Sequence, residues 1–529
     1  MVFLEIFTGP RSFGTVAWIL ISLAATIFVR FWSDNYLRAQ KLKRQRIDVP
    51  ILNLKGNEYD AALKAYVADA KGLLQRGYKE FKHGIYQIWS LHGFTTIVSP
   101  DFLEELSSLP PGTIDFYEGT RKRMVGDYEW VKLGDPLEAH TILKDLTQNF
   151  GSLLSEVADE IDHALSTELP ECKDWTPVTI QPRILRIVSL MTGRVFVGPE
   201  LNRNEEWLHI SSNFMMDIYI ASNALYKYSH FMRPFAARFL VPEIRKVWRH
   251  QATAKRLLVP IMEQRQRDAA SNPNFKKPND MIQWLMDNNA KEKHPRSFAE
   301  LAKLHLLVCF SALHTSTLAM THFLYDLAAR PEYVEPLREE QYAIQKACKG
   351  IPSKFDYNKM IRMDSFMKES QRLNPPSLMT YSRLVLTEFT LSNGVKFTPG
   401  TYILTPAALV SLDDDIWESA NEFRGFRFAD LRSRSKDDMH KFQFTTITPK
   451  ALHFGHGRQG CPGRFFASYE LKAIFSRIIE TFDIKLLDEK AGRPTNKIFG
   501  AAITPDESAQ LLLRRRRAVR ECGNELRLV

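Results

Sequence analysis

The chain has 529 residues, of which 44% are hydrophobic, and it carries a formal net charge of +10. That length and apolar content suffice for a large buried core. The five cysteines are far apart and include no C-x-x-C pair, which argues against a zinc cage and against a disulfide framework. The basic runs at residues 41–46, 121–123 and 514–517 lack a helix-turn-helix, a zinc finger and interleaved aromatics, so they do not indicate nucleic-acid binding.

The N-terminal segment predicts a membrane anchor. Residues 13–29 carry no charge and approach the length needed to span a bilayer. One arginine precedes the segment and several basic residues follow it, which by the positive-inside rule keeps the following chain in the cytosol. A cleaved signal peptide is the alternative, but it needs a basic start and a small-residue cleavage site. We expect a lumenal end at 1–12, a transmembrane helix at 13–31, a basic, proline-containing linker at 32–50 and a single cytosolic domain at 51–529.

Hydrophobic periodicity predicts a body that is mainly α with minor β. Residues 60–81 and 137–165 carry apolar residues at helical spacing. Residues 84–99 predict a β-hairpin, and so do residues 383–406, in which Asn393-Gly394 is a turn signal between alternating runs.

The clearest helical pattern starts after Ser297 and ends before Pro331. Ser297 and Glu300 form a capping box, and the helix has roughly 32 residues, or about 48 Å at 1.5 Å per residue. Near its middle, in the stretch SALHTS, Ser311 and Thr315 are four apart and share one face. Taken alone, the ordinary interpretation is that each hydroxyl bonds to carbonyls of its own helix.

A second helical pattern, at residues 357–374, ends at the double proline Pro375-Pro376. Glu369 and Arg372 within it are three apart and can form an ion pair, although such a pair on a surface contributes little. Alone, the pair indicates no function.

A glycine-rich loop, FGHGRQGCPG at residues 454–463, precedes an amphipathic helical pattern at residues 464–482. Glycines let a backbone turn tightly and approach a large flat group. Directly before a helix N-terminus, the thiolate of Cys461 is stabilised by the helix dipole and by free backbone N–H groups. An isolated cysteine is otherwise usually a small buried apolar residue.

The loop Phe454-x-x-Gly457-x-x-x-Cys461-x-Gly463 resembles the haem-ligand loop of the cytochrome P-450 family, the haem-thiolate monooxygenases. The resemblance implies a haem b group whose iron is ligated by the thiolate of Cys461, a ligand that favours cleavage of the O–O bond. Gly457 and Gly463 would then let backbone N–H groups approach the sulfur and the porphyrin. Phe454 would shield the sulfur from water.

Three further stretches resemble motifs of the same family and occur in the family's order. Glu369-x-x-Arg372 resembles its ExxR pair, and FRGFRF at residues 423–428 is similar to its Phe-x-x-x-Arg-Phe segment, in which Arg427 completes a structural Glu–Arg–Arg cluster. SALHTS resembles the oxygen-binding stretch of the central helix. The resemblance covers the whole chain, anchor included. It implies the cytochrome P-450 fold, with haem between the long central helix and the helix that follows the cysteine loop.

The resemblance also implies partners for the two haem propionates. His140 and Lys144, four apart, lie where the family usually has Trp and Arg, and a solvated helix face is the alternative for both. Arg383 matches a further propionate contact. Gln459 occupies a position usually held by Arg, with Arg458 next to it, and the sequence leaves open which of the two reaches a propionate.

In the central helix, Thr315 matches the family's threonine that hydrogen-bonds dioxygen and helps to deliver protons. Ala312 takes the place of a common glycine and leaves room for O2, and His314 replaces the usual acid and can relay protons near neutral pH. The residues expected to face the substrate are mostly apolar, although several of them could equally be plain core. They are Phe310, Leu313, Leu378, Met379 and Ile503.

The stretches SALHTST and FGHGRQGCPGRFFA resemble the membrane-bound enzymes of filamentous-fungal secondary metabolism. This implies oxygen insertion into a terpenoid or meroterpenoid at the endoplasmic reticulum membrane. Electrons are expected from NADPH through a separate cytochrome P-450 reductase, because no G-x-G-x-x-G follows a strand. Two alternatives stay open: a haem-thiolate isomerase or dehydratase that uses no O2, and a non-catalytic membrane haem sensor. The hydroxyl of Thr315 counts against both.

Overall fold

The computed structural model describes residues 44–129, 134–348, 351–520 and 526–528, together with eight positions between 18 and 42. The predicted lumenal end at 1–12 lies outside these residues, as does most of the predicted membrane helix at 13–31 and part of the linker at 32–50. Within the described part, one helix, Phe298–Ala328, is long and apolar enough to cross a membrane. Because 67% of its most apolar window is buried inside the protein, it has the character of a core helix.

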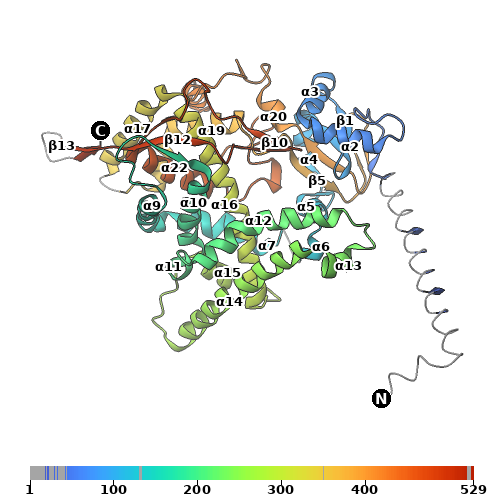
Figure 1. Cartoon of the computed structure of the whole chain (residues 1–529), viewed down its shortest axis with the longest axis horizontal. Helices are drawn as coiled ribbons and strands as arrows, with labels where there is room; N and C mark the ends of the chain where they lie inside the picture. Colours follow the sequence, from blue (N-terminus) through green and yellow to red (C-terminus); the bar gives the residue numbers. More distant parts are fainter. Residues whose placement is uncertain are drawn as a thin grey trace.

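The long helix α16 (Phe298–Ala328) runs through the middle of the body (Figure 1). Three helices pack along it: α10 (Ile180–Phe196), α12 (Glu205–Tyr226) and α14 (Pro242–Ser271). The helix that follows the cysteine loop, α22 (Arg464–Thr481), packs against it as well. Most of the buried apolar side chains of the protein form one core around α16.

The predicted start and end of α16 are confirmed. Ser297 Oγ accepts a hydrogen bond from the Glu300 N–H, and the Glu300 carboxylate accepts one from the Ser297 N–H at 2.8 Å. The helix has 31 residues and ends shortly before Pro331. At 1.5 Å per residue it is about 46 Å long, so it reaches across the body.

The other α-helices surround this centre and connect it to the sheet region. They are α2 (Tyr59–Ala68), α3 (Ala70–Glu80), α4 (Leu103–Ser108), α5 (Phe116–Arg123), α6 (Gly126–Glu129), α7 (Pro136–Thr141), α8 (Thr147–Asn149), α9 (Leu154–Glu168), α11 (Gly198–Leu201), α13 (Arg233–Phe235), α15 (Met281–Asn289), α17 (Val334–Cys348), α18 (Lys354–Lys359), α19 (Ile361–Leu373), α20 (Ala407–Ser411) and α21 (Arg427–Ser433). Two π-helical turns are η3 (Ile142–Leu146) and η5 (Ala236–Leu240), and four 3₁₀ turns are η2 (Pro100–Phe102), η4 (Phe150–Leu153), η6 (Pro331–Tyr333) and η7 (Gly457–Gln459).

The largest sheet has five strands in the order β1-β2-β8-β5-β3 and lies beside α2 and α3 (Figure 1). Only the pair β2–β8 is parallel. Its strands are β1 (Ile85–Ser90), β2 (Gly93–Val98), β3 (Ile114–Asp115), β5 (Thr380–Val385) and β8 (Tyr402–Thr405). The small sheets contain β4 (Thr176–Thr179), β6 (Phe389–Thr390), β7 (Lys396–Phe397), β9 (Phe482–Leu486), β10 (Lys497–Phe499), β11 (Ala502–Thr504), β12 (Gln510–Arg515), β13 (Ala518–Arg520) and β14 (Leu526–Leu528).

Both predicted hairpins are confirmed. Strands β1 and β2 pair antiparallel from Ile85↔Val98 to Ser90↔Gly93. In the second hairpin, the turn at Gly394, whose φ is 85°, joins β6 to β7, and the outer strands β5 and β8 pair with each other. The coarse prediction of a mainly α protein with minor β is therefore correct.

The predicted helix at 137–165 is divided by the helical turns η3 and η4 into α7, α8 and α9. Two further predicted helices are broken by a residue whose backbone is not helical. The 60–81 segment breaks at Asp69, whose backbone is not helical (φ −150°) and whose carboxylate accepts from the Gly72 N–H to cap α3. The 357–374 segment breaks at Met360, also non-helical (ψ 73°), between α18 and α19. In both segments the apolar spacing continues across the break, so periodicity alone does not reveal it.

Candidate active site

The cysteine loop folds back on itself before α22. The Cys461 N–H donates to the Phe454 carbonyl at 2.8 Å, and the Gly460 N–H donates to the Gly457 carbonyl at 3.0 Å. Gly457 has a φ of 71°, a conformation that favours glycine, and a Cβ there would lie 2.5 Å from Ser107 Oγ. The loop is therefore held in one shape by its own backbone and by glycine where another residue would collide.

Burial disfavours the anionic form of the Cys461 sulfur, and contacts around the sulfur oppose this effect in part. Burial raises the pKa of the Cys461 thiol, whereas the backbone N–H groups of Gly463 and Arg464 and the charge of Arg464 lower it. The Arg464 guanidinium also donates to the Cys461 carbonyl at 2.9 Å. A cation bound at the sulfur would offset the effect of burial on the thiolate, while the contacts with Gly463 and Arg464 would continue to stabilise it.

A cavity of about 550 Å³ separates this loop from α16. Cys461, Gly460, Gly463 and Phe454 line it from one side, and the α16 residues on its opposite wall are Val308, Ser311, Ala312, Thr315, Ser316, Leu318, Ala319 and His322. The predicted cysteine, phenylalanine and threonine thus share one cavity.

Two of the three hydroxyls of the stretch SALHTS, those of Ser311 and Thr315, face this cavity and bond within their helix. Thr315 Oγ1 donates to the Ser311 carbonyl at 2.9 Å, and Ser311 Oγ donates to the Leu307 carbonyl at 3.3 Å. Each hydroxyl oxygen keeps lone pairs that can accept from a group in the cavity. A hydroxyl that bonds to its own helix can therefore also contact a group bound in the cavity.

His314 lies elsewhere. Its Nε2 is 2.6 Å from the Ser212 carbonyl of α12, burial lowers its pKa, and it is not among the residues that line the cavity. His314 therefore lies off the cavity face of α16, although the adjacent Thr315 lines the cavity. The structure thus separates two residues that the sequence placed in one proton pathway.

Arg383 is a cation that the sequence identified, and it bonds to the cysteine loop. It is 4% exposed, stacks 4.2 Å from the ring centre of Tyr381 and donates to the His456 carbonyl at 3.2 Å. Within the described part of the chain no carboxylate lies at ion-pair distance from it, and burial lowers its pKa. A buried guanidinium that faces a cavity without an anion fits the propionate of a haem.

The neighbouring candidates for propionate contacts occupy different places. Gln459 lines the cavity, accepts from the Phe116 N–H at 3.0 Å and donates to a carboxylate of β3. Arg458 is exposed and donates to the Ser107 carbonyl at 3.3 Å. His140 and Lys144 are exposed and do not line the cavity.

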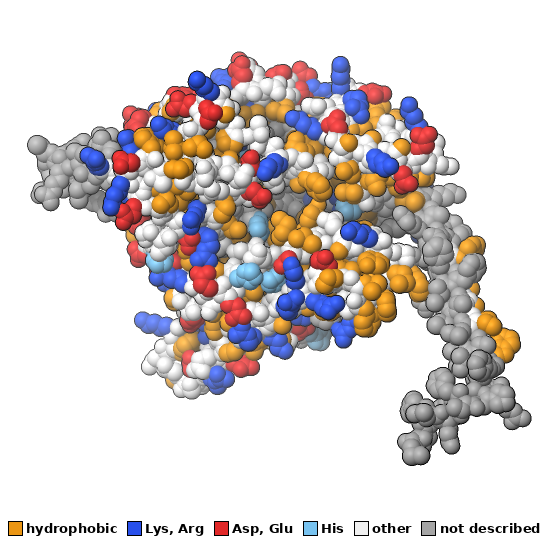
Figure 2. Space-filling model, in the orientation of Figure 1, with side chains coloured by type: hydrophobic (Ala, Val, Ile, Leu, Met, Phe, Trp, Pro, Cys, Tyr) orange, Lys and Arg blue, Asp and Glu red, His pale blue; other side chains and the backbone are white. Residues whose placement is uncertain are grey.

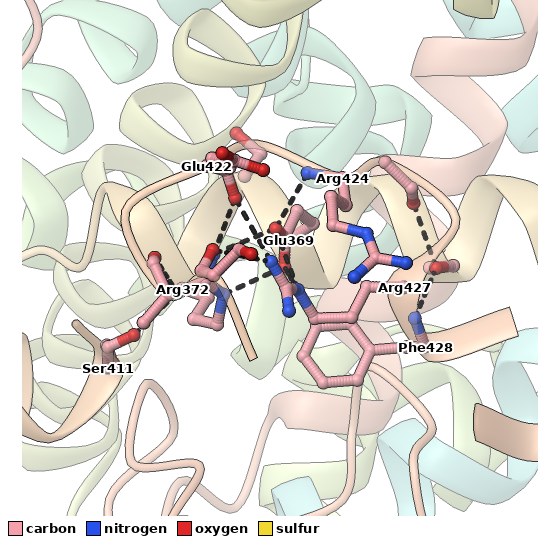
Figure 3. A network of polar contacts seen from close by, with 12 residues as sticks. Glu369, Arg372, Ser411, Glu422, Arg424, Arg427 and Phe428 are labelled. Atoms are coloured by element: carbon pink, nitrogen blue, oxygen red, sulfur yellow. Dashed lines mark hydrogen bonds and ion pairs between the residues drawn. The ribbon is translucent and has the colours of Figure 1, made fainter. Parts of the chain in front are cut away.

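The structure brings Glu369, Arg372 and Arg427 together away from the cavity (Figure 3). Arg372 donates to both Glu369 oxygens at 2.8 Å, and Arg427 Nε donates at 3.1 Å. The Arg424 N–H adds a fourth bond at 2.9 Å. The Nη groups of Arg372 donate to the carbonyls of Ser411, Ala420 and Glu422. The cluster therefore ties α19 to the segment that precedes α21.

Of the five residues expected to face the substrate, Met379 lines the cavity. Leu378 and Ile503 pack with Met379 in one buried cluster behind it. Phe310 and Leu313 belong to the core around α16, with the Phe310 ring 6.4 Å from that of Phe214.

Sequence reasoning missed several charged residues that line the cavity. Glu470 of α22 is fully buried and accepts from Thr192 Oγ1 at 2.5 Å and from Ser316 Oγ at 2.7 Å. Glu138 and Arg123 also line it, and burial raises the pKa of Glu138 to about 7. The sequence did offer a signal for Glu470, because a glutamate on the apolar face of the predicted 464–482 helix indicates a buried acid.

The cavity between the cysteine loop and the long central helix is complemented by comparisons with known proteins, of which the family model and the curated relatives give the family and the solved structure gives the fold. The cytochrome P450 family model matches residues 138–513. Cytochrome P450 monooxygenase braC of Annulohypoxylon truncatum is 36% identical over 94% of this chain and 98% of that protein, and cytochrome P450 monooxygenase paxP of Penicillium paxilli is 34% identical over 84% and 86%. The solved structure of retinoic acid bound cyanobacterial CYP120A1 matches with a TM-score of 0.65 at 17% identity over 89% of this chain and 100% of that chain.

The chain belongs to the cytochrome P450 family, and it is a monooxygenase. Its fold is the family fold. Membership implies a haem-thiolate cofactor, electrons from a reductase and a small-molecule substrate. The residues around the cavity fit such a group, because a sulfur donor, glycines and a buried arginine without a carboxylate surround it.

Proposed function

We propose that the protein binds haem b through Cys461 and inserts one oxygen atom from O2 into an apolar small molecule, a terpenoid or meroterpenoid of fungal secondary metabolism. The observation that carries this is the placement of Cys461 and Thr315 in one cavity. When bound, the haem supplies the activation of O2. Electrons come from NADPH through a separate reductase.

Five residues hold the cofactor in this proposal. Cys461 supplies the thiolate, and Gly463 leaves room for the flat group, since a Cβ there would be 3.8 Å from the nearest neighbouring atom. Phe454 covers the sulfur side of the cavity and keeps water from it. Arg383 provides the charge for one propionate and Gln459 a polar contact, whereas the exposed positions of Arg458, His140 and Lys144 favour solvent.

Thr315 and Ala312 carry the reaction on the α16 side. The Thr315 hydroxyl positions and holds a proton next to the reacting oxygen, and the small side chain of Ala312 leaves space there. We assign no proton relay to His314, because it bonds to Ser212 outside the cavity. Glu369, Arg372 and Arg427 act structurally.

We further propose a single-pass anchor at 13–31 in the endoplasmic reticulum membrane, with the body in the cytosol. Exposed apolar side chains of the body support contact with lipid. Phe235, Phe239 and Leu240 of α13 and η5 are 51%, 61% and 45% exposed. Orange side chains gather at the lower right of Figure 2, where Figure 1 places α13.

The decisive experiment is a reduced carbon-monoxide difference spectrum of the full chain in microsomes, beside Cys461→Ala. We expect the haem-thiolate band in the wild type and its loss in the variant, and an unchanged spectrum in the variant would refute the ligand assignment. Turnover with terpenoids under ¹⁸O2 then tests the reaction. One labelled oxygen in the product supports insertion, whereas oxygen-independent turnover supports the isomerase or dehydratase alternative.

A further inference from the structure

A guanidinium without an anionic partner lines the cavity at the end of α5. Arg123 is the last residue of this helix, and burial lowers the pKa of its guanidinium. Its Nε is buried without a hydrogen-bond partner, and its charge centre lies 4.7 Å from the ring centre of Tyr402. Among the described residues, no carboxylate forms an ion pair with it. An unpaired charge at this depth is costly unless a ligand completes it.

The surroundings of Arg123 favour a cation, but within the described residues its Nε–H has no hydrogen-bond partner. Its titratable neighbours are Tyr402, Tyr66 and Tyr226. The ring of Tyr402 and the C-terminal end of α5 both favour positive charge, but neither is an anion that would pair with it. Glu118, the carboxylate of the same helix, instead accepts from Arg121 at 2.7 Å.

Arg123 does not share the place of Arg383. In the paired strands β5 and β8, Arg383 lies opposite Ile403, and Leu384 lies opposite Tyr402. Successive residues of a strand point to opposite faces, so Tyr402, against which Arg123 stacks, faces away from the Arg383 side. The two arginines therefore approach the sheet from different sides.

The helix also sets the distance of Arg123 from the cysteine loop. Its first residue, Phe116, bonds to Gln459 of that loop at 3.0 Å. Arg123 lies seven positions after Phe116 in the helix, which is about 10 Å along the helix axis. Leu404, on the same face of β8 as Tyr402, and Met379 also line the cavity. A ligand that reaches Arg123 would therefore lie along an apolar part of the cavity wall.

We infer that Arg123 binds the carboxylate of an acidic substrate whose hydrocarbon body extends toward Cys461. A guanidinium pairs with a carboxylate through two parallel hydrogen bonds, one of which would satisfy the Nε–H that lacks a partner among the described residues. Oxidation then takes place on carbon remote from the acid group. This inference rests on the proposed function and narrows its substrate class to amphiphilic carboxylic acids.

The test compares dodecanoic acid with methyl dodecanoate, which share a hydrocarbon chain and differ at one end, a charged carboxylate in the first and a neutral methyl ester in the second. Binding to the full-length haem-loaded protein is measured by calorimetry and by the shift of the haem absorption band. The variants are Arg123→Met, which keeps an unbranched side chain and removes the charge, and Arg123→Lys, which keeps the charge without the planar fork. Lys122→Met is the matched control, because Lys122 is the exposed neighbour on the same helix.

We expect the wild type and Lys122→Met to bind the acid at least about tenfold more tightly than the ester. Arg123→Met should lose this preference with ester binding unchanged, and Arg123→Lys should keep part of it. Equal or weaker binding of the acid by the wild type, or an undiminished preference in Arg123→Met, overturns the inference. So does loss of haem from Arg123→Met, which would assign the guanidinium to the cofactor. A wild type with a normal carbon-monoxide spectrum but no preference for the acid refutes this inference alone. The calorimetric comparison does not depend on the carbon-monoxide spectrum, so the proposed function and this inference can fail separately.

Discussion

Ser316 of α16 donates a hydrogen bond of 2.7 Å to the carboxyl of Glu470 on α22, and Thr192 of α10 donates a second one of 2.5 Å. Three helices that surround the cavity thus meet at one fully buried acid. Burial raises the pKa of Glu470 to about 7, and the two hydroxyls lower it only in part. Near neutral pH the group is therefore divided between its two protonation states.

The free energy of unfolding should depend on pH through Glu470. The folded protein keeps a proton there that the unfolded chain releases above its ordinary pKa of 4.5. The stability from this group is complete below that pH and is lost as the pH rises to about 7, by on the order of 3 kcal/mol. Glu470→Gln should remove this decline, measured by denaturant unfolding between about pH 5 and about pH 8.

Glu489→Gln, an exposed substitution of the same kind, is the control and should leave the pH dependence as it is in the wild type. If Glu470→Gln and the wild type lose stability in parallel over this range, Glu470 titrates in the folded protein as it does in the unfolded chain.

Removal of the charge of Glu369 should cost far more than removal of a surface charge. Glu369→Gln keeps the shape of the side chain but leaves Arg372 and Arg427 buried without a counter-charge. Breaking a buried pair in this way costs roughly 3–5 kcal/mol. Because the cluster ties α19 to the segment before α21, we expect haem content per protein to fall, measured from the absorption spectrum of the purified protein.

The exposed pair of Arg267 and Glu263 on α14 gives the comparison. Glu263→Gln should cost less than about 1 kcal/mol and leave haem content unchanged. Equal losses of stability and of haem content in the two variants would show that the buried Glu369 cluster contributes no more to stability than a surface ion pair.

Gly457 offers a test of the loop shape. Gly457→Ala must adopt a φ of 71°, which costs an L-residue roughly 1–2 kcal/mol, and its Cβ also meets Ser107, with Cβ–Cβ contact at 3.0 Å. Gly394→Ala has a similar φ of 85° but no atom within 4 Å, so it isolates the backbone cost. We expect both to lower stability and only Gly457→Ala to lower haem retention, measured by haem release over time.

Combining Gly457→Ala with Ser107→Gly removes the collision and should restore most of the lost retention. No restoration would mean that the backbone conformation, rather than the contact with Ser107, limits the loop.

The elements that the sequence predicted well are those with local signals. The capping box of Ser297 fixes the start of α16, and glycine spacing before an amphipathic helix marks the cysteine loop. These signals act over a few residues and need no knowledge of neighbours. Asp69 and Met360, in contrast, end helices within patterns that remain periodic, so the breaks were not visible.

The site was only partly predictable because its members come from distant segments. His140 and Lys144 were assigned from the resemblance to the family, but α7 ends at Thr141 and the π-helical turn η3 follows, so the helical register changes between the two residues. On this stretch Glu138 and Ile142 line the cavity instead. Arg123 carries no local signal at all, since only the packing of α5 against the sheet brings it to the cavity.

Thr315 should control how efficiently electrons are used. Its hydroxyl donates to the Ser311 carbonyl and faces the cavity, so Thr315→Ala removes the hydroxyl nearest the reaction without opening a large void. If this hydroxyl delivers protons, we expect NADPH consumption to continue while product per NADPH falls by about tenfold or more and hydrogen peroxide rises. Ser311→Ala, one turn earlier on the same face, is the matched control and should leave the ratio of product to NADPH within about twofold of the wild type. An unchanged ratio in Thr315→Ala would remove Thr315 from proton delivery, whereas equal losses in both variants would point to a general disturbance of α16.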